Sequence, residues 1–262
     1  MDRGIRMSKL KSAVRNVLPR PVVAAIDKLR RLRTDRRNRS KTTEQVFTEI
    51  YANNLWGGQS GTYNSGSGSR QAAVVSPYVQ KLREELQRIG ASSLSAVDLG
   101  CGDFSVGQHL APYCGHYIGI DIVRPLIEYN QATFGDDRVC FRHANILEDE
   151  LPKADICFVR QVLQHLSNEQ IARVLPKLQK YRWCFVTEHQ AADSFGAPNI
   201  DKPHGDRIRI DHGSGVFLDE PPFNVPKKQL HLLLEADVER IGAEHDPGVI
   251  RTYLMTAEQY NP

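Results

Sequence analysis

Short apolar runs alternate with amphipathic stretches along most of the chain. Runs of strand length lie at residues 95–99, 117–120, 139–142, 155–159 and 184–187. Apolar residues recur at helical spacing between them, which predicts helices at 104–110, 125–134 and 168–180 and a short turn at 162–166. Strands that alternate with helices indicate a mostly parallel sheet with right-handed crossovers. Two further strands are expected to form an antiparallel edge, at 230–234 and 249–254.

Helix signals refine this picture. Ser167 and Gln170 have capping-box spacing, and Pro176 is expected to kink or end the helix that they begin. Upstream of the first strand, residues 43–52 and 76–90 are also predicted to be helical.

The N-terminal 41 residues form a basic arm on an acidic body. They carry 14 Lys and Arg against 3 Asp, a net charge of +11, while the remainder carries −8. Residues 7–18 predict a short amphipathic helix before Pro19, and a second piece at 22–32 leads into the charged run. The arm is either a solvated tail or a peripheral contact with anionic lipid. Nucleic acid ranks last, since the acidic body would repel phosphates.

Two segments have the composition of functional loops. Residues 53–70 place a Trp and a Tyr among Gly, Ser and Asn, within a cover segment at 42–90 that precedes a core at 91–262. Residues 188–228, here called the acceptor loop, show no convincing helix, and a loop of this length in a compact domain is usually functional.

Composition excludes several classes. No apolar run is long enough to span a bilayer, and no secretory signal is evident. The five cysteines are scattered without a C-x-x-C pair, which argues against a disulfide framework or zinc ribbon and favours a reducing cytoplasm.

The sharpest local motif is AVDLGCGDF at 96–104, where an apolar strand ends in a Gly-x-Gly turn and is expected to pass directly into a helix. Asp121 follows 19 residues beyond Gly102, at the tip of the next strand, where a carboxylate can accept hydrogen bonds from ribose hydroxyls. A dinucleotide site would want a third Gly or Ala where Ser105 stands. Asp98 and Asp103 flank the turn and fit a cationic ligand better than a pyrophosphate. An NAD-dependent enzyme is therefore the minor alternative.

These motifs resemble those of class I S-adenosylmethionine-dependent methyltransferases. The resemblance covers residues 76–254 and rests on AVDLGCGDF, on YIGIDIV around Asp121, on the Asn145 region and on LPKADICFVRQVLQHLSNEQI. It implies a Rossmann-like, mostly parallel seven-stranded sheet with helices on both faces and an antiparallel last strand. SGSGS, RQVLQHLS, VTEH and SGVFLDEPPFN are similar to bacterial methyltransferases associated with surface-polysaccharide biosynthesis.

The resemblance also implies a cofactor site for S-adenosylmethionine. The turn of Gly100, Cys101 and Gly102 would face the methionine part, Asp121 would hold the ribose, and Asp98 is counted among the cofactor-binding residues. Ile122, Asn145 and Ile146 would border the adenine, with Asn145 standing where the family commonly has Asp. Arg160 and Gln161 would lie beneath the transferable methyl, and the SGSGS loop, with Ser67 and Ser69, would cover the carboxylate end.

Two histidines are candidates for the base that an alcohol acceptor requires. His165 follows the fourth strand by six residues, and His189 follows the fifth strand directly; an unperturbed His suits this role near neutral pH. Glu188 and His189, with Asp193 or Asp206, were weighed as Mg²⁺ ligands, but no spacing is diagnostic and no metal site is assigned.

The expected function is O-methylation of a sugar hydroxyl of a glycan, glycolipid or nucleotide-sugar, by a cytoplasmic enzyme with a carbohydrate or glycolipid acceptor and peripheral contact at the inner face of the membrane. The alternatives are methylation of a small natural product or of RNA, and a non-catalytic S-adenosylmethionine-binding partner in a glycan-assembly complex.

Overall fold

The computed structural model describes residues 19–58, 62–191, 196–238 and 248–256, and the chain divides into two compact units, Met1–Lys41 and Thr42–Pro262. In the first unit, helix α2 spans Arg20–Arg39, with Pro21 in its first turn. The helix expected at 7–18 lies outside the described residues. Most of the charged run at 30–41 is helical, since α2 continues to Arg39.

The second unit contains a seven-stranded sheet. Its strands are β1 Ser95–Leu99, β2 His116–Asp121, β3 Val139–His143, β4 Ile156–Arg160, β5 Trp183–Gln190, β6 Leu230–Asp237 and β7 Val249–Met255. They lie in the order β3-β2-β1-β4-β5-β7-β6, and only the two pairings of β7, with β5 and with β6, are antiparallel. The predicted mostly parallel sheet with an antiparallel last strand is confirmed.

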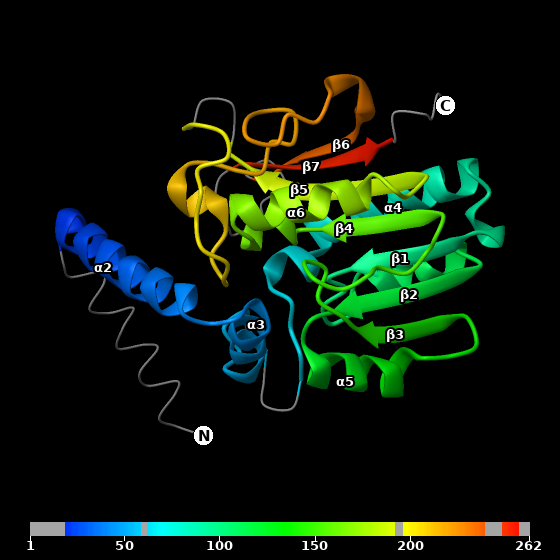
Figure 1. The fold of residues 1–262 in the computed structure, drawn as a ribbon, viewed down its shortest axis with the longest axis horizontal. Helices are drawn as coiled ribbons and strands as arrows, with labels where there is room; N and C mark the ends of the chain where they lie inside the picture. The colour runs from blue at the N-terminus through cyan, green and yellow to red at the C-terminus, as the bar shows by residue number, and fades with distance from the viewer. Residues whose placement is uncertain (1–18, 59–61, 192–195, 239–247, 257–262) are drawn as a thin grey trace. The chain divides into compact units, whose positions relative to one another are not determined.

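Helices cover both faces of this sheet (Figure 1). On one face, α3 Thr43–Ala52 and α6 Asn168–Leu178 pack against side chains such as Val97 and Val159. On the other face, α4 Ala72–Arg88 packs against Phe158 and Phe185. Alternate strand residues thus enter two separate cores, as the period of two in a strand requires. Helix α5, Arg124–Phe134, lies beside β3.

Cap signals were read correctly in α6. Ser167 and Gln170 form the expected capping box, and α6 ends two residues beyond Pro176. The same arrangement at α3, between Thr42 and Gln45, explains why that helix begins at Thr43.

The helix predicted at 104–110 is wrong. This segment holds only the 3₁₀ turn Gly107–His109, and Phe104 has a φ of +59°. The Phe104 ring packs edge-on against Tyr117 and Phe141, so tertiary contacts override the helical periodicity. As a result, the glycine turn does not pass directly into an α-helix, and the helix N-terminus that a phosphate-binding turn supplies is missing from this segment.

Candidate functional site

A cavity opens at the carboxyl ends of β1, β2 and β4, and the glycine turn forms its floor. Gly100 and Gly102 both have positive φ, at +74° and +56°. A Cβ on Gly100 would lie 2.5 Å from Cγ2 of Val162, so the turn leaves no room for a side chain there. The backbone nitrogens of Gly100 and Cys101 both donate to the carbonyl of Ile120, at 2.7 and 2.9 Å. The turn is therefore fixed to β2 before any ligand arrives.

Asp121 lies at the tip of β2, inside this cavity. Its two carboxylate oxygens accept hydrogen bonds from the backbone N–H groups of Gly102 and Val123, at 3.1 and 3.0 Å. Burial raises the pKa of Asp121 to about 6, and these N–H groups limit the rise. Each carboxylate oxygen keeps acceptor capacity beyond one N–H, so the group can also accept bonds from a ribose diol.

Asp98 lines the same cavity from β1. It accepts a hydrogen bond from the hydroxyl of Tyr117 at 2.9 Å. Burial raises its pKa to about 7, and the Tyr117 hydrogen bond and the Arg160 guanidinium hold the rise down. Two buried carboxylates with raised pKa values are typical of a site that receives a positive charge.

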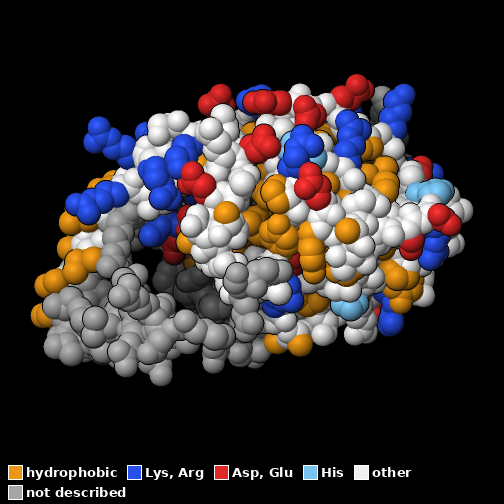
Figure 2. Space-filling model, turned by 90° about the horizontal axis from the view of Figure 1, so that it is seen from below, with side chains coloured by type: hydrophobic (Ala, Val, Ile, Leu, Met, Phe, Trp, Pro, Cys, Tyr) orange, Lys and Arg blue, Asp and Glu red, His pale blue; other side chains and the backbone are white. Residues whose placement is uncertain are grey.

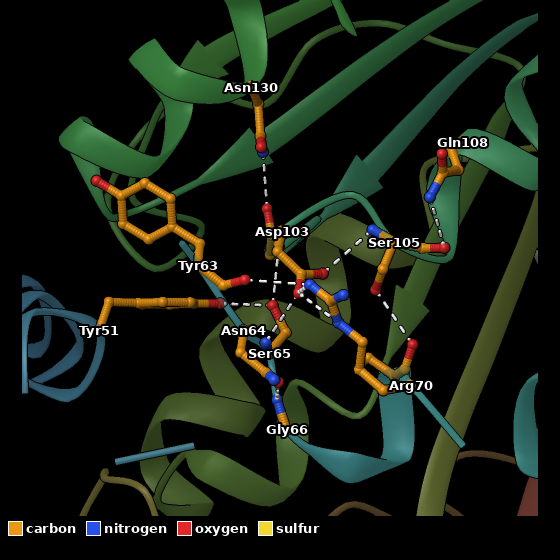
Figure 3. A network of polar contacts seen from close by, with 12 residues as sticks. Tyr51, Tyr63, Asn64, Ser65, Gly66, Arg70, Asp103, Ser105, Gln108 and Asn130 are labelled. Atoms are coloured by element: carbon orange, nitrogen blue, oxygen red, sulfur yellow. Dashed lines mark hydrogen bonds and ion pairs between the residues drawn. The ribbon is translucent and has the colours of Figure 1, made fainter. Parts of the chain in front are cut away.

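The second acidic residue of the turn, Asp103, has a different role from the one argued from sequence. Its carboxylate accepts bonds from the Arg70 guanidinium at 2.7 Å, from the backbone N–H of Ser65 and from that of Ser105 (Figure 3). In return, Ser65 Oγ accepts the backbone N–H of Asp103 at 2.8 Å and contacts the Tyr51 hydroxyl. Arg70 neutralises the charge of Asp103. Through these bonds Asp103 attaches residues 62–70, here called the Gly/Ser-rich segment, to the glycine turn.

The remaining predicted cofactor residues divide between two cavities. The cavity described so far is lined by Ser69, Ile122, Asn145, Ile146, Arg160 and Gln161, together with Asp98, Gly100, Cys101, Gly102 and Asp121. Ser67 lines the second cavity instead, with Ser65 and Gly68. The Asn145 side chain accepts the backbone N–H of Leu147 at 3.0 Å, and this local turn places Asn145, Ile146 and Leu147 along the cavity.

Arg160 joins the Gly/Ser-rich segment to β4. Its guanidinium donates to the carbonyl of Gly68 at 2.8 Å and lies 4.8 Å from the ring centre of Tyr78 in α4. Burial lowers the pKa of Arg160, and Tyr78 and Asp98 oppose this. A buried guanidinium that faces the cavity beside Asp98 suits a ligand with both a carboxylate and a positive group.

An aromatic cover over the cavity was only partly foreseen. Phe47 and Tyr51 from α3 and Trp56 from the following loop line the cavity and contact each other, with ring centres 5.2 to 6.0 Å apart. The sequence pointed to Trp56 through its glycine-rich surroundings. Phe47 and Tyr51 read as ordinary core residues of an amphipathic helix, and nothing in their spacing distinguishes the two roles.

A second cavity adjoins the first. Trp56, Ser65, Gln161 and His165 line both cavities. The second has a mixed lining. Its polar residues include Gln71, Gln164, His189, Asp206, Arg207 and Asp211, and its aliphatic residues are Leu55, Val74, Ile208, Val238 and Ile250. Trp56 Nε1 donates to the carbonyl of Asp206 at 3.3 Å, which ties the cover to the acceptor loop. The site thus has two chambers with a common wall.

His165 stands in that common wall, in the 3₁₀ turn Leu163–His165. Its Nδ1 lies 3.0 Å from the carbonyl of Gly205, and its backbone carbonyl accepts the N–H of Gly205 at 3.0 Å. Since a carbonyl only accepts, Nδ1 carries the proton and Nε2 keeps its lone pair, which faces the side-chain amide of Gln164 at 3.5 Å. Burial, with the charge of Lys202, lowers the pKa of His165 to about 3, so the ring is neutral.

The described part of the acceptor loop, from residue 196 onward, is held in place by hydrogen bonds of buried side chains. Asn199 accepts the backbone N–H of Phe217 at 2.8 Å and donates to the carbonyls of Phe217 and Pro221. Arg209 is fully buried and donates to the carbonyls of Ile200 and Leu166, at 2.6 and 2.8 Å. The loop is therefore attached directly to the turn that carries His165.

The residues weighed as Mg²⁺ ligands do not converge. The Glu188 carboxylate accepts the backbone N–H groups of Leu163 and Gln164, at 2.8 and 3.0 Å, and burial raises its pKa to about 8. Asp193 lies outside the described residues, and His189 and Asp206 line the second cavity. The position predicted for His189 after the fifth strand is wrong, because β5 runs to Gln190 and His189 pairs with Ile250 of β7. Within the described ranges, no three His, Cys, Asp or Glu side chains are grouped to hold a metal ion.

Comparison with known proteins identifies part of this unit. Residues 97–181 match the family model described as a methyltransferase domain. No curated protein matches the sequence.

Solved structures share the fold. The [4+2]-cyclase SpnF is 16% identical with a TM-score of 0.52, over 83% of this chain and 98% of its own. The magnesium protoporphyrin IX methyltransferase ChlM from Synechocystis PCC 6803, with bound S-adenosylhomocysteine, is 12% identical with a TM-score of 0.50, over 82% of this chain and all of its own. The N-methyltransferase NodS from Bradyrhizobium japonicum WM9 is 14% identical with a TM-score of 0.46, over 68% of this chain and 88% of its own.

These likenesses concern the fold, and they include a cyclase, so they do not choose a reaction. The residues of the first cavity fit S-adenosylmethionine, because the buried carboxylates of Asp98 and Asp121 line it beside the glycine turn. The chain has the Rossmann-like fold of class I methyltransferases, residues 97–181 match a methyltransferase domain, and the cofactor of such a domain is S-adenosylmethionine.

Proposed function

We propose that this chain is an S-adenosylmethionine-dependent methyltransferase that O-methylates a sugar hydroxyl of a glycan, glycolipid or nucleotide-sugar. The single observation that carries the proposal is the position of His165. It lies in the wall shared by the two cavities, with Nδ1 held by Gly205 and the lone pair on Nε2. This is where a base must stand to serve an acceptor in the second cavity and a methyl donor in the first.

The cofactor supplies a methyl group on a positively charged sulfur, already activated for transfer. The protein's task is to bind and align. In our proposal Asp121 holds the ribose, Asp98 and Arg160 hold the charged groups of the methionine part, and Asn145, Ile122 and Ile146 border the adenine. Alignment of two bound reactants accounts for about 7–11 kcal/mol of barrier reduction in favourable cases.

His165 would take up the proton that the acceptor hydroxyl loses as its oxygen bonds to the methyl carbon, while the methyl–sulfur bond breaks and the neutral thioether S-adenosylhomocysteine leaves. The imidazole is neutral throughout the physiological range because its pKa is about 3. The same low pKa makes it a weak proton acceptor, so we place its contribution near the lower end of the roughly 10²–10⁴-fold range for such groups.

The composition of the second cavity supports a sugar as acceptor. Its amide, carboxylate and guanidinium groups, from residues such as Gln164, Asp206 and Arg207, offer planar donors and acceptors, and Trp56 offers an apolar face. A hydroxyl-rich ring matches this combination better than a large apolar natural product, which would leave those polar groups without partners.

The test has two stages. Calorimetry with S-adenosylmethionine should show binding, and Asp121→Ala should weaken it by about tenfold or more, while the exposed control Asp137→Ala should leave it unchanged. Transfer of a labelled methyl group is then measured on nucleotide-sugars and oligosaccharides, against RNA and small phenols. Methylation of a sugar oxygen, located by NMR, supports the proposal.

Turnover on RNA or a phenol alone would overturn the sugar assignment while keeping the enzyme class. Tight cofactor binding without turnover on any of these acceptors would favour a non-catalytic binding partner. Stabilisation by NAD, and not by S-adenosylmethionine, in thermal unfolding would overturn both parts of the proposal.

A further inference from the structure

Helix α2 combines exposed apolar side chains with a high positive charge. Val22, Leu29 and Leu32 are 43%, 57% and 56% exposed, and at 100° per residue they lie with Ile26 on one side of the helix. Large exposed aliphatic side chains in a row are unusual on a solvated helix, which needs no apolar face.

Helix α2 has a large excess of positive charge. The helix carries eight Lys and Arg and two Asp, and three of its arginines, Arg36, Arg37 and Arg39, are in the last turn. Figure 2 shows hydrophobic side chains along part of this helix, which is at the left in Figure 1, with Lys and Arg side chains beside them.

We propose that α2 is a docking surface for an anionic membrane, with the helix lying in the plane of the headgroups. Both kinds of side chain suit such a surface. The arginines are attracted to anionic headgroups, and the aliphatic side chains reach the boundary of the acyl chains. In the described part of the chain, no helix is long and apolar enough to cross a bilayer, so the contact is peripheral.

A nucleic acid is the other polyanion that such a charge would attract. It would use the arginines alone, and the row of Val22, Leu29 and Leu32 would remain exposed beside the phosphates. The exposed aliphatic row therefore favours lipid.

The proposal goes beyond methyl transfer and does not depend on it. Its test is co-sedimentation of the full chain with vesicles of phosphatidylglycerol and phosphatidylcholine in equal parts, compared with pure phosphatidylcholine. The chain should bind the first and not the second. Leu29→Ser with Leu32→Ser should lower the partition coefficient by about tenfold at any salt concentration. Arg36→Gln with Arg37→Gln should lower it about 25-fold at low salt, at about fivefold per charge, and less at high salt.

Matched controls come from exposed residues of the second unit. Leu232, 52% exposed on β6, serves as Leu232→Ser, and Arg138→Gln with Lys153→Gln serves as the charge control. Neither control should change vesicle binding. Circular dichroism checks that each variant keeps its fold.

Three results would overturn the proposal. One is absence of binding to the anionic vesicles. A second is unchanged vesicle binding by the Leu29 and Leu32 variant, which would mean that no apolar face enters the bilayer. The third is displacement of the chain from vesicles by single-stranded RNA, with RNA binding lost in the arginine variant and kept in the leucine variant.

Discussion

The carboxylate of Glu188, in β5, accepts a hydrogen bond from the backbone N–H of Leu163 at 2.8 Å. Leu163 follows the neighbouring strand β4 and lies 25 positions earlier in the sequence. A second bond, from Gln164, fixes the same short turn, and its third residue is His165. Arg209 holds the far end of that turn through the carbonyl of Leu166. In the proposed mechanism Glu188 is thus a positioning residue, which would act on the reacting centre through His165.

Glu188→Gln should lower kcat by about tenfold and leave KM for the cofactor within twofold, because the amide can accept one of the two N–H groups but not both. The pKa of Glu188 is about 8, so in the wild type kcat should rise with pH through this value as the second oxygen becomes an acceptor. The variant should lose that step. Glu150→Gln, at an exposed position, is the control. An unchanged pH profile in the Glu188 variant would contradict the role.

His165→Asn should lower kcat about a hundredfold while S-adenosylmethionine binds with unchanged affinity. The Asn amide can still donate to Gly205 in place of Nδ1, but it has no atom in the position of Nε2. Single-turnover kinetics and calorimetry measure the two quantities separately. His109→Asn, on an exposed 3₁₀ turn, is the control. Wild-type kcat in the His165 variant would remove it as the base.

Asp98→Asn should stabilise the empty protein and weaken cofactor binding. Burial raises the folded-state pKa of Asp98 from 3.8 to about 7, so the folded state binds more protons than the unfolded state between these values. The stability of the empty protein should therefore fall as pH rises from about 4 to 7, and the variant should recover on the order of 1–3 kcal/mol at pH 8.

Thermal unfolding across pH checks the first part of this prediction, and calorimetry checks the second. In the wild type, affinity for the cationic cofactor should decline as pH falls through 7, since protonation removes the negative charge that faces it. A flat affinity between pH 8 and 6 would be evidence against Asp98 as a ligand.

Arg70→Gln should speed release of the cofactor by about five- to tenfold. Arg70 is half-exposed, but it neutralises buried Asp103 and so holds the Gly/Ser-rich segment over the cavity. The matched control is Arg88→Gln on α4, which also loses a half-exposed ion pair, with Glu85 at 2.8 Å. Stopped-flow displacement measures the rate, and equal rates in both variants would show that the ion pair does not retain the cofactor.

Periodicity and turn chemistry predicted most of the fold. The strand at 95–99 has the predicted bounds, and the antiparallel pairing of β7 was anticipated from the late pair of apolar runs. These features depend on residues near one another in sequence. The helix predicted at 104–110 is wrong because its structure depends on residues far away in sequence. Phe104 has a positive φ and packs against rings of β2 and β3, and no local pattern reports such contacts.

The candidate site shows the same division. Asp98, Asp121 and the glycine turn could be placed because parallel strands bring their carboxyl ends to one edge. The role of Asp103 could not, because its partners Ser65 and Arg70 lie more than 30 positions away. Ser67 and Ser69 were both predicted to line the cofactor site because they belong to one SGSGS segment. They form the short 3₁₀ turn Ser67–Ser69, and each lines a different cavity.

The side chains of Trp56, Gln161 and His165 line both chambers, so a single layer of side chains stands between them. A compound that joins an adenosine to a hydroxyl-rich ring through a short linker would bind in both chambers only where this layer leaves a passage, and its affinity would report that passage directly. Such a bisubstrate ligand would add the two binding energies within one molecule, and varying its ring would identify the natural acceptor without a catalytic assay.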